Sequence, residues 1–256
     1  PSALHISQDG QSILGLSAEG VTRWNAADGR LLASYHYAGM TPIALADIDG
    51  SLRVAFADQE QQNRSALLTW LLNEPTLSVP VSTLREEISD ATWHGDELII
   101  GNHRGELTLW SAHQLTKPKV KFQAHQERVS VIKVNTDQQS FISGSTDGSV
   151  ARWSLRDGRA LARHEGHKTP VTALDVSPST EKGGIVSGDR RGIIWHWREG
   201  SPVGQNWRAH SSQIRDLSIS PSGDLVVSVP VSKREESAVW KLKRDQQPQQ
   251  LASLPK

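Results

Sequence analysis

The chain of 256 residues contains no cysteine, so disulfides, thiolate metal sites and a cysteine nucleophile are excluded. It has no apolar run near the roughly 20 residues that span a bilayer. Its start, PSALHISQDG, has no apolar signal segment. These features favour a cytoplasmic over an exported location. The first residue is Pro1, which fits a processed form and a piece of a longer chain equally.

The chain also lacks an excess of either charge. Lys and Arg together number 28, as do Asp and Glu. Nucleic-acid binding relies mainly on neutralising phosphates with a basic face, so no nucleic-acid partner is expected. Hydrophobic residues make up 36% of the chain, which is enough for a buried core.

Six tryptophans recur at a nearly constant spacing along the chain: Trp24, Trp70, Trp110, Trp153, Trp197 and Trp240. Successive members are 46, 40, 43, 44 and 43 residues apart. A regular period of this size marks a repeat architecture. Six such repeats fill the chain, so the sequence predicts one repeat domain over residues 1–256.

The fourth repeat shows what one repeat contains. Extended runs are predicted at 129–134, 140–143, 150–154 and 159–163. Turns such as Asp147-Gly148 separate them, and Asp-Gly favours hairpins because Gly tolerates a positive φ. No long run has helical periodicity. Each repeat is therefore predicted to be a four-stranded sheet, and the fold to be all-β.

A lone four-stranded sheet cannot bury both of its faces, so neighbouring sheets must stack. Radial stacking produces a β-propeller. The predicted propeller has six blades, with approximate boundaries at 1–39, 40–82, 83–125, 126–167, 168–210 and 211–256.

The fourth repeat carries an Ala-His pair, a Ser-Gly second strand, an Asp-Gly turn and a closing Trp. The residues are His125, Ser143, Asp147 and Trp153. This combination resembles the WD-repeat β-propeller family. In that family the four side chains form a hydrogen-bonded tetrad that braces each blade, and the resemblance implies the same here.

The resemblance extends into the next two repeats through a second set of residues: His167, Ser187, Trp197, His210, Ser228 and Trp240. Arg191 stands at the Asp position of the fifth repeat, and Arg104 at that of the third. The sixth repeat expands its turn to 230–237. The first two repeats resemble the family by periodicity alone.

The two ends of the chain leave the closure of the propeller open. Residues near each end read as complete strands of their own blades, so no strand is left over to interlock the first and last blades. Either six blades close by packing alone, or the chain is part of a seven-bladed parent.

His125, His167 and His210 invite a zinc hypothesis, because His is the commonest metal ligand. In a propeller they would lie far apart, each in its own blade, so no metal site is expected. One carboxylate per turn falls short of the ligand set for calcium. No phosphate loop or dinucleotide fingerprint appears. No cofactor is expected.

The turns between second and third strands emerge with the blade connections on one rim of a propeller. The resemblance implies that this rim is the partner site. The candidate partner-binding residues are His103, Arg104, Lys168, Arg190, Arg191, Lys233 and Arg234, with residues 58–64 nearby. Arg is suited to carboxylate or phosphate recognition. Taken singly, each of these residues reads equally as a solvated loop side chain.

The leading functional hypothesis is a non-enzymatic scaffold that binds a protein or peptide at this rim. The alternatives are a regulatory or sensor propeller domain of a larger protein, and a propeller enzyme with a site in the central channel. The first-strand residues expected to line such a channel are apolar or small, which disfavours catalysis. They are Ala3, Ile43, Ala44, Val131, Ala173 and Leu217.

Overall fold

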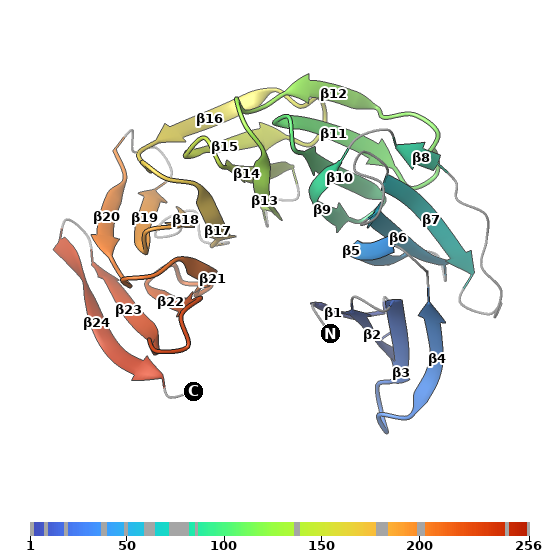
Figure 1. Ribbon diagram of the computed structural model, residues 1–256, viewed down its shortest axis with the longest axis horizontal. Coiled ribbons are helices and arrows are strands. Elements are labelled where there is room, and N and C mark those ends of the chain that lie inside the picture. The colour runs from blue at the N-terminus through green and yellow to red at the C-terminus, as the bar shows by residue number, and fades with distance from the viewer. Residues whose placement is uncertain are drawn as a thin grey trace. The chain divides into compact units, whose positions relative to one another are not determined.

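The computed structural model describes twelve stretches of the chain: residues 3–7, 10–17, 20–36, 40–48, 51–58, 65–71, 82–84, 87–135, 139–177, 184–198, 203–243 and 246–254. These residues form 24 strands and no helix. The strands make six four-stranded antiparallel sheets, each built from four strands consecutive in sequence (Figure 1). This architecture confirms the all-β propeller fold class.

Contacts between residues divide the chain into two compact units. Unit 1 comprises residues 1–103 and 108–121, and unit 2 comprises residues 104–107 and 122–256.

Three sheets begin in unit 1. The first contains β1 (Ala3–Ile6), β2 (Ser12–Ser17), β3 (Gly20–Asn25) and β4 (Leu31–His36). The second contains β5 (Met40–Ile48), β6 (Ser51–Asp58), β7 (Ser65–Leu71) and β8 (Ser82–Leu84). The third contains β9 (Ile88–His94), β10 (Glu97–Asn102), β11 (Glu106–Ser111) and β12 (Val120–Gln123). The division between the units runs through β11 and β12.

Unit 2 contains the other three sheets. The fourth contains β13 (Val129–Val134), β14 (Ser140–Ser145), β15 (Ser149–Ser154) and β16 (Ala160–Glu165). The fifth contains β17 (Val171–Val176), β18 (Gly184–Asp189), β19 (Ile193–Arg198) and β20 (Gln205–Arg208). The sixth contains β21 (Ile214–Ile219), β22 (Leu225–Pro230), β23 (Ser237–Lys243) and β24 (Gln246–Leu254).

The sheets of unit 2 repeat the same strand register. The closing tryptophan of the third strand pairs with the second residue of the preceding strand in every case: Phe141 with Trp153, Ile185 with Trp197 and Val226 with Trp240. The same side of each sheet therefore carries the indole. Trp207, on the outer strand β20, is buried against Trp240 of the next sheet, with ring centroids 5.9 Å apart.

The core of unit 2 lies between successive sheets. Val186 and Ile194 of the fifth sheet pack with Val226 and Leu217 of the sixth, and all four are buried. Each such side chain contributes roughly 1.5–3 kcal/mol of burial free energy. Packing between neighbours is therefore what stabilises sheets that could not stand alone.

First strands are also joined to the next sheet by side-chain hydroxyls. Ser130 Oγ donates to Val171 O at 2.6 Å, and Thr172 Oγ1 donates to Ile214 O at 2.6 Å. These two bonds occupy equivalent positions in successive repeats, so the hydroxyl sets the distance between neighbouring first strands.

The expectation that the small and apolar first-strand residues face an open channel is wrong for three of them, whereas Ile43 and Val131 are half-buried. Ala44 is buried in unit 1, and Ala173 and Leu217 are buried in unit 2. They lie in cores between adjacent sheets. Side chains alternate between the two faces of a strand, and a neighbouring sheet covers the face that carries these residues.

Candidate functional site

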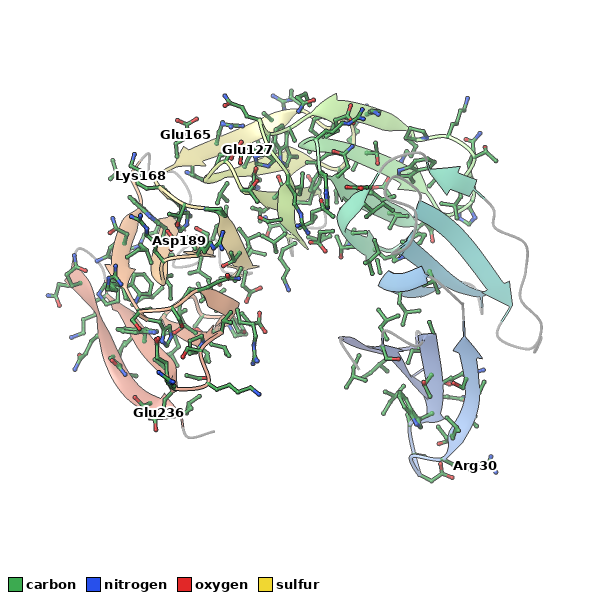
Figure 2. All side chains as sticks on the ribbon, viewed as in Figure 1. Arg30, Glu127, Glu165, Lys168, Asp189 and Glu236 are labelled. Atoms are coloured by element: carbon green, nitrogen blue, oxygen red, sulfur yellow. The ribbon has the colours of Figure 1, made fainter. Side chains whose placement is uncertain are left out.

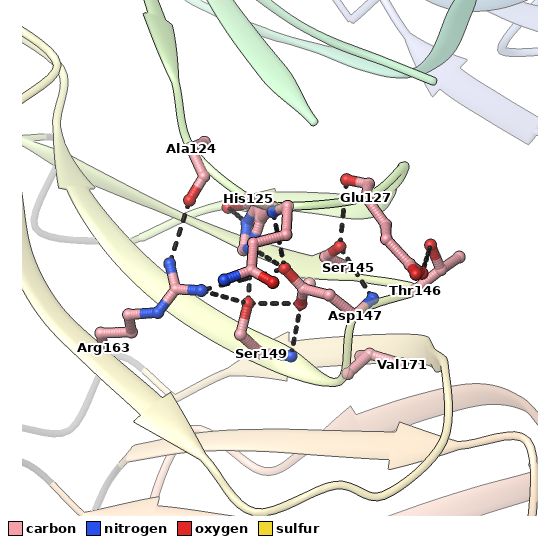
Figure 3. A network of polar contacts seen from close by, with 12 residues as sticks. Ala124, His125, Glu127, Ser145, Thr146, Asp147, Ser149, Arg163 and Val171 are labelled. Atoms are coloured by element: carbon pink, nitrogen blue, oxygen red, sulfur yellow. Dashed lines mark hydrogen bonds and ion pairs between the residues drawn. The ribbon is translucent and has the colours of Figure 1, made fainter. Parts of the chain in front are cut away.

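The fourth sheet holds a continuous chain of buried hydrogen bonds that runs from a tryptophan to a carboxylate. Trp153 Nε1 donates to Ser143 Oγ at 2.8 Å, and that hydroxyl lies 2.6 Å from His125 Nε2. Across the ring, His125 Nδ1 lies 2.7 Å from Ser149 Oγ, which donates to Asp147 Oδ1 at 2.6 Å (Figure 3). Buried polar groups need partners, and this chain supplies them.

The proton positions follow from the carboxylate end of the chain. The single hydroxyl hydrogen of Ser149 goes to Asp147, so His125 Nδ1 donates to Ser149. Burial lowers the pKa of His125 from 6.5 to about 4, outweighing the opposing effect of the Asp147 charge. The ring is therefore neutral at pH 7, and its Nε2 accepts a hydrogen bond from Ser143.

Asp147 stays ionised in this network. Burial alone would raise the pKa of its carboxyl group. Hydrogen bonds from Ser149 and from the backbone N–H of Gln126 more than offset burial, so the pKa lies below its ordinary value of 3.8. Arg163 on β16 completes the group, donating to Ala124 O at 3.0 Å and to Ser149 Oγ at 3.1 Å (Figure 3).

The fifth sheet forms the same network without a bridging serine between the histidine and the carboxylate. Trp197 Nε1 donates to Ser187 Oγ at 2.9 Å, and the hydroxyl lies 2.8 Å from His167 Nε2. His167 Nδ1 then contacts Asp189 Oδ2 directly at 3.0 Å. The spacing of the repeats predicts this carboxylate at the position of Arg191, whereas the structure supplies it from Asp189, two residues earlier at the end of β18.

Asp189 also holds the turn that follows it. Its Oδ1 accepts the backbone N–H groups of Arg191 at 2.8 Å and Ile193 at 3.0 Å. Burial would raise the pKa of this carboxyl, but the bonds from His167 and from the turn bring it below its ordinary value. A usable signal was present in the sequence, because an Asp directly after the Ser-Gly pair can reach the histidine of its own blade.

In the sixth sheet the carboxylate comes from the expanded turn. Trp240 Nε1 donates to Ser228 Oγ at 2.9 Å, and His210 Nε2 lies 2.8 Å from the same oxygen. His210 Nδ1 lies 3.4 Å from Glu235 Oε2. Burial lowers the pKa of His210, and the Glu235 carboxylate opposes this shift. Glu235 also accepts the Ser211 N–H at 3.0 Å.

The third sheet satisfies its closing indole differently. Trp110 Nε1 donates to Thr108 Oγ1 at 2.8 Å, within the same strand. The position that carries a serine in the later sheets is Ile100 here, which is apolar. The four-residue network is therefore described in the fourth, fifth and sixth sheets only.

Each histidine is thus committed to the serine of its own sheet. Among the described residues, no three His, Cys, Asp or Glu side chains are grouped as metal ligands. No helix in the described part of the chain is long and apolar enough to cross a membrane.

Backbone hydrogen bonds join the turn of one sheet to the connection that enters the next. Gly192 O accepts the N–H groups of Ala209 at 2.9 Å and His210 at 3.2 Å, and Gly105 makes the same pair of bonds with residues 124–125. Gly192 has a φ of 79°, and a Cβ there would lie 2.2 Å from His210 O. Only glycine fits this contact.

We refer to the loops 124–128, 146–148, 166–170, 190–192, 209–213 and 231–236 as the rim of unit 2. Five of the candidate partner-binding residues are exposed on it: Lys168, Arg190, Arg191, Lys233 and Arg234. Lys168, Asp189 and Glu236 are labelled in Figure 2. None of the five cationic side chains has an ion pair or hydrogen-bond partner among the described residues.

The other two candidates lie in the turn between β10 and β11. His103 Nδ1 lies 2.8 Å from Glu87 Oε2, so this side chain is already paired. Arg104 is exposed, and its carbonyl accepts the Gln123 side-chain amide at 2.7 Å. Residues 59–64, which the sequence also placed at the rim, lie outside the described residues.

The stacked four-stranded sheets, with a serine, a histidine and a tryptophan bonded together in three of them, define a repeat protein of the β-propeller class. Two family models match the chain. The Vps42 beta-propeller model matches residues 78–201, and the WD domain, G-beta repeat model matches residues 200–233. The chain belongs to the WD-repeat β-propeller family.

Curated relatives share part of the chain. Protein groucho of Drosophila melanogaster is 27% identical over 51% of this chain and 18% of its own length. Eukaryotic translation initiation factor 3 subunit I of Eremothecium gossypii is 26% identical, over 43% and 31% of the two chains. Protein ROOT INITIATION DEFECTIVE 3 of Arabidopsis thaliana is 24% identical, over 58% and 36%. The chain thus spans well under half of each relative.

Solved structures support the fold. A chain of the mitotic checkpoint complex superposes with a TM-score of 0.79 at 15% identity, covering 99% of this chain and 76% of that one. The computationally designed Ika8 protein superposes with a TM-score of 0.70 at 21% identity, covering 93% and 70%.

Proposed function

We propose that this chain is a non-enzymatic scaffold that binds another protein or peptide through the rim of unit 2. The observation that carries the proposal is the set of five exposed cations on loops held by buried networks. Their side chains have no partner among the described residues. Such charges, presented on a rigid support, are suited to recognition by direct contact.

The hydrogen bonds beneath the rim lower the entropic cost of binding a partner. Asp189 fixes the turn that carries Arg191 through two backbone hydrogen bonds. Glu235 fixes its loop through Ser211. A surface ordered before binding loses less conformational freedom when the partner arrives. The relatives named above, WD-repeat proteins of several kinds, are consistent with an interaction role.

Affinity capture from a native lysate tests the proposal. A photoreactive residue is placed at position 190, on the rim, or at position 159, in the turn at the other end of β15. We expect a protein to be crosslinked from position 190 and not from 159. Capture should also be lost in the variant Lys168→Glu, Arg190→Glu, Arg191→Glu, provided circular dichroism shows that it is folded. Equal crosslinking from both positions would overturn the rim assignment.

A further inference from the structure

The chemistry of the rim cations indicates which class of protein segment could bind there. This inference rests on the proposed function. We propose that the rim of unit 2 recognises a protein segment rich in aspartate and glutamate. The recognising residues are Lys168, Arg190, Arg191, Lys233 and Arg234.

The loops that carry these cations are joined to one another. The N–H of Arg190 donates to Pro170 O at 3.0 Å, linking its turn to the connection that contains Lys168. Gly192 O accepts the N–H of His210, linking the same turn to the next connection. Ser211 then donates to Glu235, beside Arg234. The cations therefore lie on a continuous hydrogen-bonded run of loops.

The carboxylates nearby do not neutralise these cations. Asp189 is buried and bonded to His167 and to its own turn. Glu235 is bonded to Ser211. Glu236 is the other carboxylate among loops 166–170, 190–192 and 231–236, which carry five cations against two carboxylates. Over the whole rim, with Arg128, Glu127 and Asp147 added, six cations stand against four carboxylates. The whole chain, by contrast, carries equal numbers of the two charges.

Two cations away from the rim show the paired arrangement. Lys119 forms an ion pair with Glu97. Arg163 lies 3.3 Å from a carboxylate oxygen of Glu165 and bonds Ser149 as well. None of the five rim cations has such a carboxylate partner among the described residues. Guanidinium groups bind carboxylates through two parallel hydrogen bonds, which lysine cannot do.

An acidic protein segment fits better than a nucleic acid. Nucleic-acid affinity comes mainly from neutralising phosphates over a broad basic face, and this chain carries equal numbers of the two charges. A nucleic acid repeats its charge at every step and would be repelled by Glu235 and Glu236. A peptide carries its carboxylates on flexible side chains, so an acidic segment can reach the cations while turning its charges away from these two side chains.

The test uses the full chain and three fluorescein-labelled probes: octaglutamate, octaglutamine and decathymidylate. Fluorescence anisotropy measures the dissociation constant of each at low and at physiological salt. The rim variant is Lys168→Glu, Arg191→Glu, Arg234→Glu. The matched control is Lys133→Glu, Arg156→Glu, Arg159→Glu, which reverses three exposed cations of the same unit away from the rim.

We expect wild type to bind octaglutamate more tightly than octaglutamine, and to bind it more weakly as salt screens the charges. The rim variant should lose at least about tenfold in affinity, because each exposed ion pair contributes roughly twofold and each reversal adds a repulsion. The control should stay within about twofold of wild type, since its changes lie outside the contact.

Three outcomes would overturn the inference: equal binding of the two peptides, equal loss in both variants, or tighter binding of decathymidylate. The last outcome would make the rim a nucleic-acid site. If a protein is still crosslinked at position 190 while octaglutamate does not bind, the scaffold function stands and only the acidic chemistry fails. If octaglutamate binds at the rim and no protein is crosslinked, the scaffold function fails instead.

Discussion

Asp189 Oδ2 lies 3.0 Å from His167 Nδ1, so in the fifth sheet the carboxylate bonds the histidine directly. In the fourth sheet His125 Nδ1 and Asp147 Oδ2 are 3.9 Å apart, and the Ser149 hydroxyl bridges them. The carboxylate that completes the hydrogen-bond network therefore comes from different positions of the repeat in the two sheets. The networks of the fourth and fifth sheets are expected to respond differently to mutation.

Replacing Asp189→Ala should destabilise unit 2 by about 3 kcal/mol, because it leaves His167 Nδ1 and two turn N–H groups without their acceptor in a buried site. Urea unfolding of the two proteins measures the difference. The control is Asp157→Ala, in an exposed turn, which should shift the midpoint far less. Equal shifts for the two variants would refute the role assigned to Asp189.

Replacing Ser149→Ala should remove the bridge of the fourth sheet and cost about 1–3 kcal/mol. The Asp147 carboxylate is too far from His125 to take over the bond, and Arg163 also loses a partner. Ser222→Ala, at an exposed turn, serves as the control. Unchanged stability in the Ser149 variant would mean that the network relaxes without its bridge.

Gly192→Ala should be more damaging than Gly95→Ala, although both residues have a positive φ. The new Cβ at position 192 would lie 2.2 Å from His210 O, whereas nothing lies within 4 Å of one at position 95. The backbone conformation alone costs about 1 kcal/mol in either case. The free energy of unfolding should fall by at least about twice that amount for Gly192→Ala, and similar losses would contradict the loop contact.

His196→Val should reduce the sensitivity of the fold to acid. His196 is buried, neither ring nitrogen has a partner among the described residues, and burial, helped by Arg198, lowers its pKa to about 4. The unfolded chain, with a pKa near 6.5, then takes up more protons between pH 6.5 and pH 4. Stability therefore falls as the pH drops through that window, by about 3 kcal/mol for this residue.

Unfolding free energies at pH 7 and pH 4.5 measure this effect. Val239 stands at the equivalent position of the sixth sheet, so valine suits the site. The loss between the two pH values should shrink in the variant without vanishing, because the pKa of His125 is lowered in the same direction. The same loss in both proteins would show that His196 does not titrate in this window.

The strands were predictable because their signals are local. The prediction of 129–134 coincides with β13, and 140–143 falls inside Ser140–Ser145. The number of repeats was predictable as well, because the spacing of the tryptophans can be read directly from the sequence. The second sheet runs to Leu84, two residues beyond the expected boundary at 82, because β8 pairs with β7 there.

The carboxylates of the fifth and sixth networks were not predictable by the same reasoning. A hydrogen bond depends on where an oxygen lies in space, and Asp189 and Glu235 reach their histidines from positions that differ from that of Asp147. Aligning the repeats by residue spacing finds the carboxylate only when it stands at the same position in every repeat. Whether the rim cations have partners within the chain could be seen only in the coordinates, and the rim as a partner-binding site stays a prediction.

The hydroxyl bonds from Ser130 to Val171 O and from Thr172 to Ile214 O are made to main-chain oxygens. A carbonyl is present whatever side chain the residue carries, so a neighbouring repeat needs no matching mutation to receive the bond. A gene segment that encodes one whole repeat carries its own donor and meets an acceptor in any repeat it is inserted beside. Descent by duplication, followed by divergence of side chains, is therefore compatible with the same bond being made in the fourth and fifth sheets.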